Sequence, residues 1–145
     1  MQLETPPFIR EHKRTGRRAL GVRYERKAQA EFYERYPGFL ASPWFHYQDR
    51  EGDKWCQCDG LIINPWQGHL SIVEVKYQHT ETAYEQLFKL YLPVVLALFG
   101  GLYRIGCVEV VKWFDPAIIT PQPPMLCKDP DIAPPGKFNV HIWRP

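Results

Sequence analysis

Two carboxylates and a lysine fall on two consecutive segments that have the composition of β-strands. Asp59 lies in the first segment, WCQCDGLII, and Glu74 and Lys76 lie in the second, HLSIVEVKY. Side chains alternate across a strand, so Glu74 and Lys76 share one face, and a hairpin brings Asp59 beside Glu74. Carboxylate oxygens suit a hard divalent cation, which can activate a neighbouring water for hydrolysis. The pattern predicts a hydrolytic metal site.

The link between these segments is Asn64-Pro65-Trp66-Gln67-Gly68, which is rich in turn-forming residues and predicts a β-hairpin with a longer loop. The alternative is that Glu74 and Lys76 form an ordinary ion pair on an exposed strand. The flanking sequences LIIN and LSIVEV are strongly apolar, and an isolated charge pair is costly in such a strand. The metal site is therefore the favoured interpretation.

The cysteines and apolar segments limit which classes of protein the chain can belong to. The four cysteines, Cys56, Cys58, Cys107 and Cys127, lack zinc-site spacing. Strand alternation places Cys56 and Cys58 on the face opposite Asp59, so we expect them to pack as reduced, small apolar groups outside the site. No secretory signal or membrane span is visible, and we expect a cytoplasmic protein without membrane contact.

Positive charge is concentrated at the start of the chain. The net charge is only +2, yet nine of the 18 basic side chains lie in the first 35 residues, against five acidic ones. A basic segment ahead of an acidic site suits a polyanionic partner such as nucleic acid, and a solvated arm is the alternative. The candidate nucleic-acid-binding residues are Arg14, Arg17, Arg18, Arg23 and Lys27.

The 145 residues predict a single domain with a substantial core. Helical spacing is found over 21–36 and 80–99, where Thr80 or Thr82 is a candidate N-cap and Pro93 predicts a kink. We expect strands over 44–48, 55–63, 69–77, 102–114 and 137–143, the last at a sheet edge, and an irregular proline-rich loop over 115–136. This order predicts an α/β, three-layer sandwich in which helices flank a central mixed sheet.

Asp59 followed by Glu74-Val75-Lys76, on a hairpin between two helices, resembles the PD-(D/E)XK nuclease superfamily over roughly 18–114. The resemblance implies a restriction-endonuclease-like α-β-β-β-α-β core in residues 19–114, preceded by a basic arm (1–18) and followed by the proline-rich loop and terminal strand (115–145). It implies that Asp59, Glu74 and the Val75 carbonyl hold Mg²⁺ or Mn²⁺. Lys76 would position or activate the attacking water.

Two flanking matches extend the resemblance. Family members carry a glutamate shortly after a glycine on the first helix, which makes Glu25 a further candidate metal ligand, with solvation of a surface glutamate as the alternative. RecB-like members carry a glutamine followed by a tyrosine at i+4 on the second helix. Gln86 fits as a catalytic residue, but Tyr91 is one residue late, and a one-residue shift turns an α-helical side chain by about 100°. This offset counts against Tyr91 as a site residue.

The expected function is metal-dependent hydrolysis of DNA, directed by branches, single strands or ends rather than by sequence. A homodimer would suit cutting of two strands, and a protein partner could supply specificity. The alternatives are a catalytically inactive nucleic-acid-binding module with a degenerate site, or an assembly module.

Overall fold

A computed structural model describes residues 2–3 and 17–145. Its centre is a six-stranded sheet with the order β2-β5-β6-β7-β9-β8. The pairs β2–β5 and β5–β6 are antiparallel, whereas β6–β7, β7–β9 and β8–β9 are parallel, so the expected mixed sheet is confirmed. The strands are β2 (Phe39–Ala41), β5 (Gly60–Asn64), β6 (His69–Gln78), β7 (Arg104–Trp113), β8 (Pro124–Leu126) and β9 (Phe138–Ile142).

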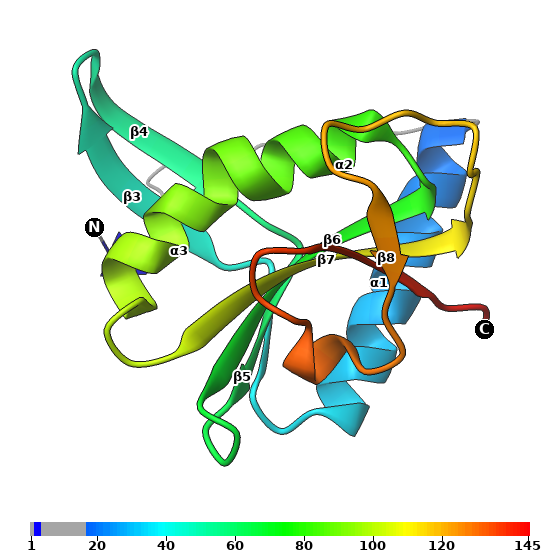
Figure 1. Ribbon diagram of the computed structural model, residues 1–145, viewed down its shortest axis with the longest axis horizontal. Helices are drawn as coiled ribbons and strands as arrows, with labels where there is room; N and C mark the ends of the chain where they lie inside the picture. Colours follow the sequence, from blue (N-terminus) through cyan, green and yellow to red (C-terminus); the bar gives the residue numbers. More distant parts are fainter. Residues whose placement is uncertain (1, 4–16) are drawn as a thin grey trace.

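Helices cover both faces of this sheet, as expected for a sandwich (Figure 1). Helix α1 (Arg17–Arg35) buries Tyr24, Ala28 and Phe32 in a core that includes Val73 and Val75 of β6. The second helical run packs on the other face, in a core that also contains Leu70 and Ile72 of the same strand. This run consists of α2 (Glu81–Glu85), η1 (Gln86–Tyr91) and α3 (Leu92–Phe99). Strand β6 thus alternates between the two cores.

A second, three-stranded sheet projects from the body of the molecule as the β3–β4 hairpin (Figure 1). It contains β1 (Gln2–Leu3), β3 (Trp44–Asp49) and β4 (Gly52–Gln57). The expected single strand over 55–63 is therefore wrong, because β4 and β5 belong to different sheets and the chain turns between them at Cys58 and Asp59. The predicted β5–β6 hairpin is confirmed.

The sheet edge differs from the expected one. Strand β9 is not at the edge, because it lies between β7 and β8. The edge strand β8 and a short 3-10 turn, η2 (Pro130–Ile132), both lie within the segment expected to be an irregular loop. Three-residue β8 is too short to show alternation, and its pairing partner β9 is distant in sequence.

The second helical run is not a continuous α-helix. It begins at the predicted cap, because the Thr80 hydroxyl accepts a hydrogen bond from the Ala83 amide at 3.3 Å. Six residues then form the π-helical segment η1, in which the Leu92 amide bonds to the Leu87 carbonyl, five residues back. Pro93, which predicts a kink, lies in the first turn of α3, directly after the π-helical segment. A π turn amounts to one extra residue inserted into a helix.

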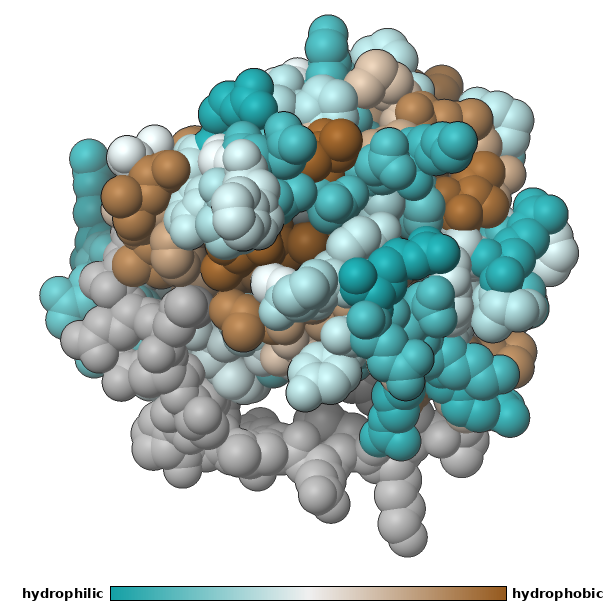
Figure 2. Space-filling model, turned by 90° about the horizontal axis from the view of Figure 1, so that it is seen from below, coloured by the Kyte–Doolittle hydropathy of each residue, from teal (hydrophilic) through white to brown (hydrophobic). Residues whose placement is uncertain are grey.

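Figure 2 shows, on the face that it presents, several apolar patches separated by polar side chains. Among the described residues, no helix is long and apolar enough to cross a membrane.

Deletion of Lys89, an exposed residue of η1, tests whether the π turn is such an insertion. The deletion should convert η1 into an α-helix, leave the later residues in register and change the free energy of unfolding by less than about 1 kcal/mol. Deletion of Ala30, also exposed but within regular α1, should rotate Phe32 out of its core and cost about 3–5 kcal/mol. Urea unfolding measures both. Equal losses would refute the insertion.

Candidate active site

Asp59, Glu74 and Lys76 converge at the point where β5 begins. Asp59 immediately precedes β5, and the β5–β6 register, with Gly60 opposite Val73, places Asp59 level with Glu74. The two carboxyl groups interact directly. The Lys76 ammonium lies 3.9 Å from Glu74 Oε1, and the Lys76 side chain is a quarter exposed. The three residues on which the sequence pattern depends are thus brought together.

The backbone of Val75 is turned towards Asp59. The Val75 amide donates to Asp59 Oδ2 at 2.7 Å, and the Asp59 amide donates to the Val73 carbonyl at 3.2 Å. Since residues two apart on a strand direct their polar groups to the same side, the Val75 carbonyl faces the Asp59 side of β6 as well. Beyond Val73, β5 no longer pairs with β6 on that side. The carbonyl is therefore available as an oxygen donor beside the two carboxylates.

Helix α1 helps to hold Asp59 in place. The Gln29 side-chain amide donates to the Asp59 carbonyl at 2.9 Å and to the Ser42 hydroxyl at 2.8 Å. The Ser42 amide also donates to the Asp59 carbonyl. Gly60 must lack a side chain, because a Cβ there would lie 2.4 Å from the Phe39 ring. These contacts join α1, the turn before β3 and the start of β5 around one carboxylate.

The carboxylate pair is poorly solvated. Burial, followed by the neighbouring Glu74, raises the pKa of Asp59 to about 8. Burial also raises the pKa of Glu74, although Asp59, Lys76 and Tyr91 oppose that rise. Ionisation of two adjacent, poorly solvated carboxyls is unfavourable even with Lys76 nearby, which favours a shared proton or a bound metal.

The donor set fits Mg²⁺ or Mn²⁺. Glu74 is buried, and its Oε2 atom has no hydrogen-bond partner. Within residues 2–3 and 17–145, no three His, Cys, Asp or Glu side chains are grouped to hold a metal ion, so Glu25 does not complete a three-acid cluster. Mg²⁺ commonly takes only one or two carboxylates and completes its shell with water and substrate oxygens. Asp59, Glu74 and the Val75 carbonyl meet that requirement.

Tyr91 belongs to the site, contrary to the expectation from helical spacing. Its hydroxyl interacts with the Glu74 carboxyl, and burial followed by Glu74 raises the pKa of Tyr91. The reason is the π turn, whose five-residue spacing places Gln86 and Tyr91 on one side of the helix. Gln86 Oε1 is buried without a hydrogen-bond partner. The π turn thus accommodates the extra residue between Gln86 and Tyr91 without turning Tyr91 away from Gln86.

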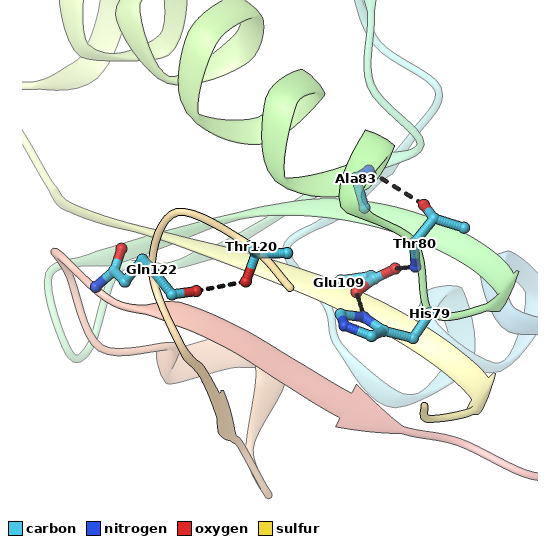
Figure 3. A network of polar contacts seen from close by, with 6 residues as sticks. All are labelled: His79, Thr80, Ala83, Glu109, Thr120 and Gln122. Carbon is cyan, nitrogen blue, oxygen red and sulfur yellow. Dashed lines mark hydrogen bonds and ion pairs between the residues drawn. The ribbon is translucent and has the colours of Figure 1, made fainter. Parts of the chain in front are cut away.

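Glu109 is a third carboxylate near the site that the sequence reasoning missed. It is the β7 partner of Glu74 in the parallel ladder and is fully buried. Figure 3 shows its carboxylate at the start of α2, where Oε1 is 2.5 Å from His79 Nδ1 and Oε2 accepts from the Thr80 amide at 3.1 Å. The signal was an acidic residue inside the apolar run GCVEVV. Glu109 fixes the connection that joins Lys76 to Gln86.

Cys58 lies closer to the site than strand alternation predicts. Burial raises its pKa, and the charges of Glu74 and Asp59 raise it further. Its thiol donates to the Gly60 carbonyl at 3.3 Å. The alternation fails because the chain leaves β4 before Cys58. All four cysteines are free, as expected.

The remaining site candidates are spread along α1. Glu25 lies near enough for its charge to raise the pKa of Glu74, and its metal-binding role stays a prediction. Arg23 and Lys27 are exposed. Arg17 and Arg18 form the first residues of α1, and Arg14 lies outside the described residues.

The raised pKa of Asp59 predicts how stability changes with pH. The folded state binds the Asp59 proton more tightly than the unfolded state, where the pKa is near 3.8. The protonated Asp59 therefore adds to the free energy of unfolding below pH 4, and this stabilisation is lost as pH rises through about 8. In EDTA the free energy of unfolding should therefore fall over this window, by at most about 1.4 kcal/mol per pH unit for one proton. The groups facing Asp59 are Glu74, Lys76, Tyr91 and Cys58.

Asp59→Asn should flatten this fall, whereas Asp115→Asn, a change at an exposed aspartate, should leave it unaltered. Mg²⁺ should stabilise the wild type more at pH 8 than at pH 5, because the cation competes with the proton. Urea unfolding at several pH values measures these effects. Parallel curves for Asp59→Asn and the wild type would contradict the assignment.

Comparison of the chain with protein-family models, with curated proteins and with solved structures finds no match. The site residues and their geometry therefore carry the functional argument.

Proposed function

We propose that this protein is a metal-dependent nuclease that hydrolyses DNA phosphodiester bonds. The observation that carries the proposal is the buried Glu74 Oε2 atom, which has no hydrogen-bond partner and lies in a carboxyl group beside Asp59 and Lys76. A structural ion pair would satisfy its buried oxygens. A site that awaits a cation leaves one oxygen free. The resemblance to PD-(D/E)XK nucleases connects this arrangement with phosphodiester hydrolysis.

Each residue has a distinct task in this proposal. Asp59, Glu74 and the Val75 carbonyl hold the cation, which, when bound, polarises a phosphate oxygen and offsets its charge. The Lys76 side chain is partly exposed, and its ammonium would orient the attacking water and stabilise developing negative charge. Tyr91 interacts with the Glu74 carboxyl and restrains it. Gln86 has an unpaired amide oxygen that can accept a hydrogen bond from the water or from Lys76.

The substrate is proposed to be recognised by structure rather than by base sequence. A domain of this size leaves little surface of its own for reading a long base sequence. Branched, single-stranded or ended DNA is the expected substrate, and a homodimer or a partner protein would add specificity. We place the protein in the cytoplasm, which agrees with its free cysteines.

Cleavage assays with purified protein test this function. Plasmid, branched DNA and single-stranded DNA are incubated with Mg²⁺ or Mn²⁺. We expect cleavage that falls to background in Asp59→Asn and Glu74→Gln, which lose a metal ligand, and that falls about 10²- to 10⁴-fold in Lys76→Met. Circular dichroism checks that each variant is folded.

Two variants serve as matched controls. Lys89→Met removes an exposed lysine that pairs with Glu85, and Glu81→Gln removes an exposed carboxylate at the start of α2. Both should cleave like the wild type. Cleavage that survives Asp59→Asn and Lys76→Met would overturn the site, and DNA binding without cleavage in either metal would favour an inactive binding module.

A further inference from the structure

Two cations surround one tryptophan at the carboxyl end of β7. The Arg144 guanidinium lies 4.6 Å from the centre of the Trp113 ring, and the Lys112 ammonium lies 5.6 Å from it. Lys112 also lies 5.5 Å from the Tyr77 ring. Arg144 Nε donates to the Lys112 carbonyl at 3.1 Å, which fixes the guanidinium over the ring. We call Lys112, Trp113 and Arg144 the edge cluster.

The edge cluster carries two positive charges without a matching acid. In the part of the chain that the structure describes, neither Lys112 nor Arg144 forms an ion pair with a carboxylate, whereas Lys54 and Lys89 each do. Trp113 is 43% exposed, which leaves part of its ring surface open to solvent. Both cations lie within 5.6 Å of the centre of one ring, and an anion bound between them would offset their mutual repulsion. The cluster therefore combines an anion site with an exposed aromatic ring.

The register of the sheet places this cluster close to the candidate active site. Lys76 pairs with Val111 in the β6–β7 ladder, and Trp113 follows two residues later, opposite Gln78. Strand geometry then separates the Cα atoms of Lys76 and Trp113 by about 8 Å. A polyanion bound at the edge cluster can thus continue directly to Lys76.

The geometry points to a site for an unpaired nucleic-acid strand at the edge cluster. An unpaired base stacks on Trp113 or on the Arg144 guanidinium, while Lys112 and Arg144 contact the flanking phosphates. Inside a duplex, neighbouring base pairs cover both faces of each base, so a single strand is favoured over a duplex for such stacking. This site would bind the substrate of the proposed nuclease, and the identification of the polyanion as nucleic acid rests on that proposed function.

Trp66, the other strongly exposed tryptophan, is a poorer stacking candidate despite being 97% exposed. It lies in the β5–β6 turn, at the opposite end of β6 from Lys76. From His69 to Lys76 the strand extends about 23 Å. Trp66 therefore provides a matched control for Trp113.

Binding of labelled short oligonucleotides in EDTA, followed by fluorescence anisotropy, tests the inference without requiring cleavage. An unpaired thymidine strand and an unpaired uridine strand distinguish DNA from RNA, and a duplex of equal length reports the preference for unpaired bases. We expect single strands to bind more tightly than the duplex. Trp113→Ala should weaken single-strand binding about 5- to 150-fold, Trp113→Phe should retain most of the affinity, and Trp66→Ala should have no effect.

The phosphate contacts have their own readout. Arg144→Gln should reduce the slope of log affinity against log salt by about 0.7, whereas Arg104→Gln, at the far end of β7, should leave the slope unchanged. Thermal unfolding verifies that each variant is folded. Wild-type affinity in both Trp113→Ala and Arg144→Gln, or equal binding of single strands and duplex, would overturn the inference.

This outcome is separable from that of the proposed function. Strand binding that depends on Trp113, with no cleavage in Mg²⁺ or Mn²⁺, would keep the edge cluster and reject the nuclease. Cleavage that depends on Asp59 and Lys76, with no effect of Trp113→Ala on binding, would keep the nuclease and reject the edge cluster.

Discussion

The close approach of two carboxyl groups, the partly buried Asp59 and the buried Glu74, is the constraint around which the structure is organised. Burial raises the pKa of both groups, so their ionised forms together are unfavourable without a cation. The fold nevertheless keeps them together through the β5–β6 register and the Val75 amide. Gln29 of α1 fixes the backbone of Asp59 from the other face. A protein that gained nothing from this pair would be more stable with apolar residues there.

The geometry of the second helical run is matched to the Asp59–Glu74 pair. One extra residue in this helix would turn Tyr91 away from Glu74, and the π turn removes that offset locally. Glu109 anchors the start of the run to β7 through Thr80 and His79, so the helix begins at a fixed distance from Lys76. Sheet, cap and π turn therefore act together to place Lys76 and Tyr91 beside the carboxyls.

Local sequence signals predicted the parts of the site that lie within one hairpin. The two-residue spacing puts Glu74 and Lys76 on one face of their strand, and the turn at 64–68 predicts the hairpin. Thr80 is recognisable as the N-cap of the helix that follows. The break at Asp59 was missed because an unbroken β-like composition hides a change of sheet. Strand β8 and the role of Glu109 depend on partners distant in sequence. Glu109 could have been suspected by the reasoning applied to Glu74, since a lone acid in an apolar strand needs a partner.

The most direct measurement is a crystal structure of the wild-type protein soaked in Mn²⁺ at about pH 8, where anomalous scattering locates the metal. A cation that uses Glu74 Oε2 explains why this buried atom has no hydrogen-bond partner. We expect an anomalous peak in contact with Asp59, Glu74 and the Val75 carbonyl. Mn²⁺ bound elsewhere, with Asp59 and Glu74 still joined through a shared proton, would contradict it.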